Sequence, residues 1–515
     1  MANNTPTLVC SSLSKNQVSS LIKVPSGGGL TQVQWDNSQS FTPLGQLVFF
    51  SHFLECSGLF ESWVDSAPLS YKSNNAPEVK DVLGTLMLSV LVGHNRYCHI
   101  SQLYGDKVCA EVLGLSKICS DDSSRRAMKR LDECEAMAWL DQSLKDSCEP
   151  MLSRDWILDL DSTVKPVFGH QEGAAIGYNP TKPGRPSYSV HSYFIANTRI
   201  ALGVEVRPGT ENAGKHTLPK LFKLLDSLVE SQRPEFIRGD VSYGNENMMS
   251  ECEKRGIDFI FKLKKSSNVK KLITRLEQSH RDWHNAGQGW QGQKATLRLD
   301  SWSRERQVLV LRRKKESKPK KQDPQLSDKQ NEQLFFHEIL PPTEETDWEY
   351  ATVITSLDLP VMTLAQHYRD RGDCENNYDE YKNQWGWSGF TSKDLCSTRI
   401  MACIVALVAN WWNVYARLAM PQKHAEAITT RPCLLNAVGR FVRHAGQRFI
   451  RISTTNAAAE KIVQMTCTVA EFLKNLTAAH YDTKLRWKAI IRRAFIFFEY
   501  KQALQTTLQI GQKAH

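Results

Sequence analysis

The sequence predicts an α/β protein: a mixed sheet with helices, interrupted by a β-rich insertion and flanked by helical N- and C-terminal regions. Short apolar strands follow one another between Trp156 and Val206, and helices and strands alternate after them. That order is typical of a mixed sheet with an antiparallel edge. Segments with period-two alternation lie farther along the chain, and segments with helical spacing lie at both ends.

The first part of the chain precedes the sheet. Residues 1–40 are rich in Ser, Thr and Asn, and we expect a flexible arm there. Residues 41–150 have helical spacing, including an apolar run at 83–92 that predicts a buried helix. Ser120 is placed to cap a basic helix. Such a helix either contacts a polyanion or presents a solvated face, and the sequence leaves both open.

The predicted sheet domain comprises residues 151–265 and 351–420. Its first strand ends in Asp161 and its fourth ends in Asp240. The expected strands are Trp156–Asp161, Tyr188–Asn197, Ile200–Val206, Phe236–Asp240 and Asp258–Lys264, with helices at 218–229 and 245–255.

The β-rich insertion is expected at residues 266–350. Residues 294–300 and 306–312 alternate with period two, as hairpin strands do. Seven of the ten residues from Arg312 to Lys321 are basic, which is typical of a solvated loop and also suits a phosphate contact. Residues 421–515 are expected to form a C-terminal helical region that includes basic stretches at 440–448 and 484–493.

Bulk composition narrows the class of protein. The 515 residues carry a net charge of +10, which suits a polyanionic partner. The 13 cysteines show no zinc-ligand spacing, so reduced thiols are expected. The N-terminal residues lack a secretory pattern. The apolar run Ile400–Ala416 contains two asparagines and is better explained as a buried helix than as a membrane span, so we expect a cytoplasmic protein with no membrane contact.

The two strand-end aspartates are candidate metal ligands. If their strands are neighbours, Asp161 and Asp240 face one crevice, because sites in open sheets lie beyond strand ends. Asp at a strand end is also common as a turn or cap residue. Asp155 and Asp159 share the period-two face of Asp161 and are rival candidates.

A run of polar residues from Tyr368 to Lys382 is the most informative segment. Read as one helix, it places Tyr368, Arg371, Glu375 and Lys382 within a stripe about 60° wide. A carboxylate between cations and a phenol suits a metal-bound phosphate, although charged stripes are often plain solvent-facing surface. With Asp161 and Asp240, Glu375 would complete an all-oxygen set, which selects Mg²⁺ or Mn²⁺ over Zn²⁺.

These residues resemble the DDE transposases of bacterial insertion sequences, in the branch with a Tyr-x2-Arg-x3-Glu-x6-Lys signature. The signature is matched in full at Tyr368, Arg371, Glu375 and Lys382. The motifs at 161–163 and 237–240 resemble the two acidic motifs of the family, and the segments 169–184 and 383–390 resemble one of its subgroups. The resemblance runs from about Trp156 to Trp412.

The resemblance implies an RNase H-like catalytic domain and metal-dependent cut-and-paste transposition by nicking, hairpin formation and strand transfer. It implies that Asp161, Asp240 and Glu375 are catalytic and hold two Mg²⁺ ions. It further implies that Tyr368, Arg371 and Lys382 hold DNA phosphate near the hairpin. A flipped base would stack on an aromatic residue of the insertion, for which Trp348 is the candidate and Tyr350 the substitute; ordinary packing explains Trp348 as well.

The implied partners are double-stranded DNA at the element's inverted-repeat ends and at the target. The helical region 41–150 would bind the ends, and a homodimer or larger assembly would bring two ends together. Two alternatives remain: an RNase H-like DNA nuclease without strand transfer, and a catalytically inactive domesticated DNA-binding protein.

Overall fold

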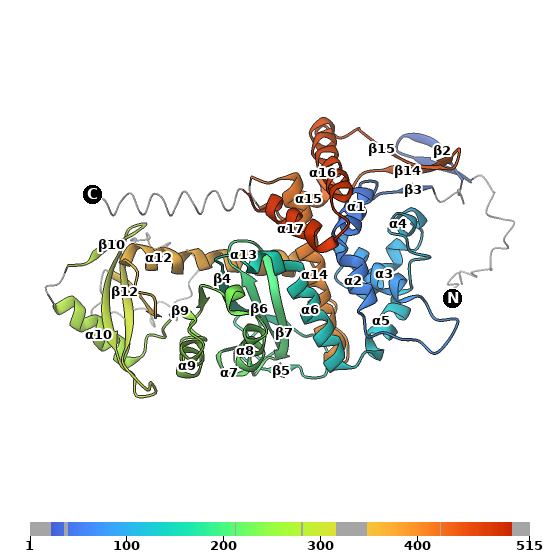
Figure 1. The fold of residues 1–515 in the computed structure, drawn as a ribbon. Helices are drawn as coiled ribbons and strands as arrows, with labels where there is room; N and C mark the ends of the chain where they lie inside the picture. Colours follow the sequence, from blue (N-terminus) through green and yellow to red (C-terminus); the bar gives the residue numbers. More distant parts are fainter. Residues whose placement is uncertain are drawn as a thin grey trace.

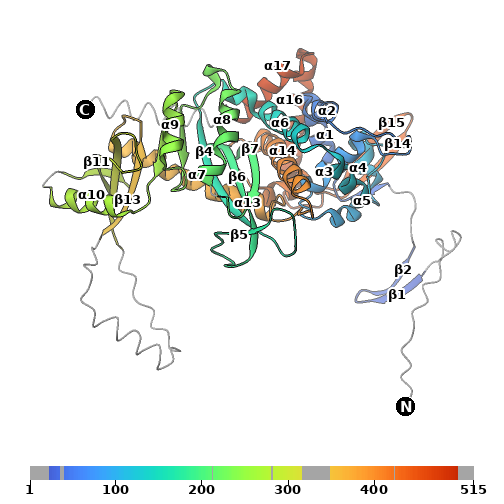
Figure 2. The same ribbon diagram turned by 90° about the horizontal axis from the view of Figure 1, so that it is seen from below.

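A computed structural model describes residues 22–34, 40–211, 213–279, 282–315, 348–422 and 424–496. The molecule is elongated, with a sheet-rich end, a central sheet and a helical end (Figure 1). The view from below in Figure 2 keeps α10 (Ser267–Gln278) and its neighbouring strands at the end opposite the N-terminal helices.

A ten-stranded mixed sheet organises the centre of the fold. Its order is β10-β11-β12-β13-β9-β8-β4-β6-β5, and β7 also pairs with β6. The pairs β4–β8 and β8–β9 are parallel, whereas the others are antiparallel. The strands are β4 (Ile157–Pro166), β5 (Ala175–Ile176), β6 (Pro186–Ile195), β7 (Ile200–Pro208), β8 (Phe236–Gly239), β9 (Asp258–Lys262), β10 (His284–Gly287), β11 (Trp290–Leu297), β12 (Arg306–Lys314) and β13 (Trp348–Thr355). The predicted mixed α/β fold is confirmed.

Strand β4 is longer than the sequence predicts. We expected it to end at Asp161, but it continues to Pro166 because its antiparallel pairing with β6 extends to Ser187. Its parallel pairing with β8 stops earlier, at Leu160 opposite Gly239. Asp161 therefore lies where one neighbour of β4 ends and the other continues.

The strands expected as an insertion extend this same sheet. Strand β13 pairs with β9 from Val353 to Thr355, and β12, β11 and β10 follow outward. The segment also contains α10, which the β-rich prediction missed; Ser266 accepts a hydrogen bond from the Val269 amide at its N-terminus. Residues 316–347, which include much of the predicted basic run, lie outside the described residues.

Helices occupy the other end of the molecule and the faces of the sheet. The N-terminal set comprises α1 (Leu47–Ser57), α2 (Leu59–Asp65), α3 (Val79–Leu91), η2 (Tyr97–Leu103), α4 (Lys107–Val112), α5 (Asp121–Arg130) and α6 (Glu133–Leu152). The later helices are α7 (Ala213–His216), α8 (Leu218–Asp226), η3 (Glu230–Gln232), α9 (Glu246–Lys254), α14 (Leu395–Ala419), α15 (Ala427–Leu434), α16 (Ala459–Ala479) and α17 (Thr483–Ala494).

Helix α14 is an apolar helix of the core. It is the one described helix that is long and apolar enough to cross a membrane, and 83% of its most apolar window is buried inside the fold. Its Asn410 exchanges two 2.8 Å hydrogen bonds with the backbone of Ala201 on β7. This explains how a buried helix can contain an asparagine: the Asn410 side chain satisfies its hydrogen bonds with the backbone of the sheet.

Two hairpins lie where other structure was expected. Residues 440–448, expected among helices, fall in the antiparallel pair β14 (Gly439–His444) and β15 (Gln447–Ile452). Ala445 and Gly446 both have positive φ, as a tight two-residue hairpin turn requires. Strand β14 also pairs with β3 (Phe41–Thr42). Within the expected flexible arm, β1 (Ile22–Ser26) pairs with β2 (Gly29–Val33); residues 1–21 and 35–39 lie outside the described residues.

The signature segment is not one continuous helix, as we had expected. It consists of α12 (Val361–Arg369), the 3₁₀ turn η4 (Asp370–Gly372) and α13 (Asp373–Asn383). A 3₁₀ turn has three residues per turn rather than 3.6, so the angular positions of the side chains shift across it. The four signature residues are thus divided among three elements. The prediction that they form one stripe along a single helix is wrong.

Candidate active site

Two aspartates lie side by side where β4 and β8 part. The last parallel pair joins Leu160 and Gly239, so Asp161 and Asp240 are the next residues in register. Residues in register on adjacent parallel strands project to the same face, about 4.8 Å apart at the backbone. Asp240 accepts a hydrogen bond at 2.8 Å from the Ser242 amide in the turn after β8. The sheet therefore brings together two carboxylates separated by 79 residues of chain.

Two residues before these aspartates on the same two strands, Asp159 and Arg238 form a buried ion pair. Both carboxylate oxygens of Asp159 accept from the Arg238 guanidinium, at 2.6 and 2.7 Å, and both residues are fully enclosed. Arg238 also donates to the His367 carbonyl of α12 at 2.7 Å. This bidentate pair fastens α12 to the sheet and occupies Asp159. The other rival, Asp155, is exposed and precedes the strand.

Arg371 reaches from η4 to Asp161. Its Nη1 lies 3.1 Å from Asp161 Oδ2, and the Ser162 amide donates to Oδ1 of the same carboxylate at 2.8 Å. Burial raises the pKa of Asp161 to about 6; Arg371 opposes the rise, and the nearby carboxylates of Asp240 and Glu375 add to it. The carboxyl thus sits among two like charges and one opposite charge.

Glu375 lies in the first turn of α13 and is exposed. An acidic side chain there is favoured by the partial positive charge of the helix N-terminus. Its charge is one of the smaller causes that raise the pKa of Asp161, so the two carboxylates lie within electrostatic range of each other. Within the described residues, no three acidic, histidine or cysteine side chains are close enough to hold a metal ion in this conformation. The three carboxylates therefore interact electrostatically but are not close enough together to coordinate one metal ion in this conformation.

Residues 69–473 match the family model described as transposase DDE domain group 1. The chain belongs to this family. No curated protein matches the chain. Among solved structures, it is similar to piggyBac transposase in a synaptic complex with hairpin DNA, at 9% identity and a TM-score of 0.36, over 89% of this chain and 87% of that one. So distant a likeness adds nothing to the assignment, which rests on the family match.

One further residue of this DDE transposase, Tyr368, interacts with the Arg371 side chain that contacts Asp161. Tyr368 lies near the end of α12 and is partly buried. Burial raises the pKa of Tyr368, while Arg371 opposes that rise. For Arg371, burial would lower the pKa, but Asp161 and Tyr368 raise it overall, so the guanidinium stays charged. The Tyr368 phenol and the Arg371 guanidinium can thus both donate hydrogen bonds to a group bound beside the acids.

Lys382 lies apart from Tyr368 and Arg371. It is near the C-terminal end of α13, seven residues or about 10 Å beyond Glu375. Burial lowers the pKa of its ammonium, and Asp379 partly opposes that. Lys382 lines a cavity with Lys165 of β4 rather than joining the cluster at Asp161.

Trp348 is the first residue of β13 and does not lie beside the acids. Its strand β13 is separated from β8 by β9. Trp348 also lies five residues, or about 17 Å, before Val353, where the pairing of β13 with β9 begins. The Arg312 guanidinium lies 4.4 Å from its ring centroid and 4.0 Å from that of Trp283. The structure thus places Trp348 in a basic aromatic surface on the outer strands; its substitute Tyr350 is on the same strand.

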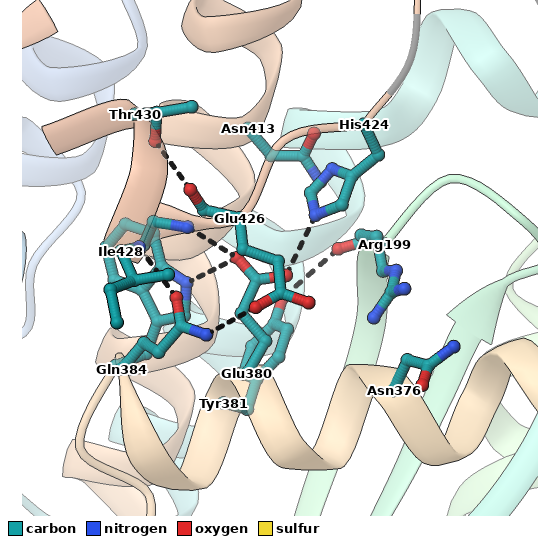
Figure 3. Close-up of polar contacts among 12 residues, drawn as sticks. Arg199, Asn376, Glu380, Tyr381, Gln384, Asn413, His424, Glu426, Ile428 and Thr430 are labelled. Carbon is teal, nitrogen blue, oxygen red and sulfur yellow. Dashed lines mark hydrogen bonds and ion pairs between the residues drawn. The ribbon is translucent and has the colours of Figure 1, made fainter. Parts of the chain in front are cut away.

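A network that the sequence did not reveal anchors the second half of α13. Figure 3 shows Glu380 accepting from His424 at 2.8 Å, and it also accepts from the Ala427 amide at 3.2 Å. One turn later, Gln384 donates to Glu426 at 2.6 Å and accepts from the Ile428 amide at 2.7 Å. These contacts join the helix that carries Glu375 to the start of α15. In the sequence, Glu380 is one of several acidic residues in a polar segment. Its burial sets it apart from the others, and the sequence carries no signal for that burial.

The donor chemistry of the site fits a divalent cation. All three acids offer hard oxygen ligands. Burial, with the nearby carboxylates of Asp240 and Glu375, raises the pKa of Asp161, and a bound cation would stabilise the charged form against these effects. Asp161, Asp240 and Glu375 are the residues that would hold it, with Arg371 supplying positive charge at one side.

Proposed function

We propose that this protein is a cut-and-paste transposase of a bacterial insertion sequence, in the branch with the Tyr-x2-Arg-x3-Glu-x6-Lys signature. The contact between Arg371 and Asp161 carries the proposal, since it joins the signature segment to the strand that bears the first acid. The net charge of +10 supports a DNA partner. The protein would act in the bacterial cytoplasm, where such DNA lies.

The proposed reaction runs in four phosphoryl transfers. Water attacks the phosphodiester at the element end, which breaks the bond to the 3′ oxygen and frees a 3′-hydroxyl. That hydroxyl attacks the opposite strand, so a hairpin forms on the element and the flanking DNA is released. A second water reopens the hairpin, and the recovered 3′-hydroxyl attacks target DNA. Each step forms one P–O bond, to a water or hydroxyl oxygen that gives up its proton, and breaks the P–O bond to the leaving 3′ oxygen, which takes up a proton; no redox partner is needed.

Each candidate residue has a distinct role in this scheme. Asp161, Asp240 and Glu375 would hold two Mg²⁺ ions, which when bound activate the attacking oxygen and stabilise the leaving oxygen. Arg371 and Tyr368 would hold the phosphate oxygens by charge and hydrogen bonding. Trp348 would stack a base displaced by the hairpin bend. A homodimer or larger assembly would hold two ends.

The deciding experiment uses DNA that carries the two ends flanking the gene. With Mg²⁺, purified protein is expected to nick each end, to produce hairpins and to join the ends to a second duplex. Cleavage without joining would favour the alternative of an RNase H-like nuclease. Binding without cleavage would favour the alternative of an inactive DNA-binding protein. A chelator is expected to abolish cleavage while leaving end binding in place.

A further inference from the structure

The hairpin of β14 and β15 is a basic two-stranded ribbon. The residues from Gly439 to Ile452 include four arginines and one histidine and no acidic residue. Around the turn, every residue from Arg443 to Phe449 is exposed. Both views place β14 and β15 at the periphery of the helical end of the molecule (Figures 1 and 2). The ribbon is therefore a positively charged surface that a large anionic partner can reach.

The strand register places the arginines of the ribbon directly opposite one another. Arg440 pairs with Arg451, and Arg443 pairs with Arg448. Opposed side chains on antiparallel strands project to the same face with their Cβ atoms about 5 Å apart, and like charges in that position are destabilising. The two pairs are three residues apart along β14, so each face of the ribbon carries one pair of like charges.

The two arginine pairs differ in their surroundings. Arg443 forms an ion pair with Glu111 of α4, so its face of the ribbon lies towards that helix. The opposite face, which carries Arg440 and Arg451, is named the outward face here, and both of its arginines are exposed. Arg440 stacks 5.6 Å from the ring centroid of Phe41 on β3, but neither arginine has a carboxylate partner among the described residues. The outward face thus carries two opposed positive charges without a described counter-ion.

The rest of the outward face suits the groove of a DNA duplex. It continues to the turn with the pairs Val442–Phe449 and His444–Gln447. Phe449 is 43% exposed. Imidazole and amide groups hydrogen-bond base edges, and an apolar ring contacts the thymine methyl group. The major groove is about 12 Å wide and admits a two-stranded ribbon. The outward face therefore combines cations for phosphates with polar and apolar groups for base edges.

The base of the ribbon is fixed to the start of the N-terminal helical region. Strand β14 pairs with β3 at Gly439 and Thr42. Nearby, the Gly45 amide donates to the Ala437 carbonyl at 2.7 Å. A Cβ atom on Gly45 would lie 2.8 Å from that carbonyl oxygen, so glycine permits this close approach of the two backbones. A ribbon held at its base presents its outward face in a defined orientation, which lowers the ordering cost of binding.

We propose that the β14–β15 ribbon binds the duplex DNA of the element ends in the major groove, with Arg440 and Arg451 on backbone phosphates. The proposal rests on the proposed function, because its ligand is the DNA that the enzyme would cut. It adds a second contact surface to the helical region 41–150, for which end binding is expected. The phosphate charges offset the repulsion between the two opposed arginines.

Binding of a duplex that carries the element ends, measured at several salt concentrations, tests the arginine contacts without any need for cleavage. The double variant Arg440→Gln with Arg451→Gln (the outward-face variant) is expected to lower the slope of log K against log salt by about 1.8, or about 0.9 for each lost phosphate contact. Arg440→Lys with Arg451→Lys is expected to keep most of the wild-type slope, because both charges remain.

The matched control is Arg443→Gln with Arg448→Gln, which removes the same charge from the other face of the same ribbon. It is expected to keep the wild-type slope. Equal decreases in the control and the outward-face variant, or a decrease in neither, would overturn the proposal. The outward-face variant is also expected to keep the wild-type Tm, because it loses no ion pair with a described residue. A large loss of Tm would overturn the proposal in favour of a structural role for the arginines.

A second arm tests the placement of the ribbon in the groove. It compares the end duplex with a scrambled duplex of equal length and composition. Gln447→Ala is expected to reduce the preference for the end duplex by about 5- to 150-fold, the effect of losing one bidentate contact to a base. An unchanged preference would overturn the major-groove placement.

Two further outcomes separate the ribbon from its alternatives. Vesicles that contain phosphatidylserine present a different anionic surface. If the outward-face variant loses vesicle binding but keeps wild-type DNA binding, DNA is not the partner and the proposal is overturned. Wild-type protein that binds the ends through Arg440 and Arg451 but never cuts them would overturn the proposed function and leave the DNA-binding ribbon standing, so the two failures are distinguishable.

Discussion

Arg371 and Asp161 are 210 residues apart in the chain and are joined by a 3.1 Å contact between Nη1 and Oδ2. One residue belongs to the turn between α12 and α13, and the other lies on β4 just beyond its pairing with β8. The contact brings a fixed positive charge to a carboxyl whose burial otherwise favours the neutral form. It also connects η4, the turn that precedes α13 and Glu375, to the sheet.

Asp240→Asn is expected to abolish nicking of end DNA and to leave end binding largely intact. The substitution keeps the shape of the side chain but removes a charged oxygen ligand next to Asp161. Cleavage of a labelled duplex and a mobility-shift assay measure the two properties. Asp155→Asn is the control, because that exposed residue precedes the strand and should retain full activity. Equal cleavage by Asp240→Asn and wild type would remove Asp240 from the site.

Asp159→Leu is expected to destabilise the fold by about 3–5 kcal/mol, since it leaves the enclosed Arg238 without its partner. The double variant Asp159→Leu with Arg238→Met should recover much of that loss, because both charges are gone. Chemical denaturation of the single and double variants measures the effect. The folded double variant should still cleave DNA; if it does not, Asp159 has a role beyond holding α12.

Glu380→Gln is expected to lower both stability and cleavage. The substitution removes the charge that His424 faces at 2.8 Å, and the buried Glu380 is then held only by weaker hydrogen bonds. A cost on the order of 2 kcal/mol is expected for a charge-assisted contact of this kind. Thermal unfolding and cleavage rate are measured together. Asp379→Asn, an exposed neighbour on the same helix, should change neither, and similar losses in both variants would contradict a specific anchoring role.

The buried His191 side chain is expected to make the protein less stable to unfolding as the pH falls. The ring is fully buried, its two nitrogens have no hydrogen-bond partner among the described residues, and burial lowers its pKa to about 3. Below the unfolded pKa of 6.5, the unfolded state binds a proton that the folded state does not, so stability falls as pH falls. The expected loss is about 1.4 kcal/mol per pH unit.

The measurement for His191 is chemical denaturation at neutral and mildly acidic pH. His191→Leu should show a shallower loss of stability with acid than wild type, because it has no proton to bind in the unfolded state. His170→Leu, at an exposed position, should keep the wild-type dependence. If His191→Leu and wild type respond equally to acid, the buried ring is not the source of the sensitivity.

Trp348→Ala is expected to impair hairpin formation more than first-strand nicking. Stacking of a displaced base on an aromatic ring contributes about 1–3 kcal/mol, which corresponds to roughly 5- to 150-fold in the hairpin step. Separate time courses for the nick and the hairpin measure the two steps. Trp348→Phe should keep much of the hairpin rate. Equal slowing of both steps would instead favour a packing role with Arg312.

The sequence by itself determined the elements with strong local patterns. Period-two alternation located the central strands, helical spacing located α8 and α9, and the apolar run with two asparagines located the core helix α14. The signature spacing from Tyr368 to Lys382 is likewise a local property. Local patterns work here because side-chain periodicity reports directly which face of an element is buried.

Tertiary structure alone decided how those elements meet. The register of β4 on β8 separates Asp159, held by Arg238, from Asp161, although both share one face in sequence. The 3₁₀ turn divides the signature among three elements, and Lys382 lines a cavity away from the Arg371–Asp161 contact. Strand register and side-chain pairing depend on partners far away in the chain, and a local pattern carries no information about them.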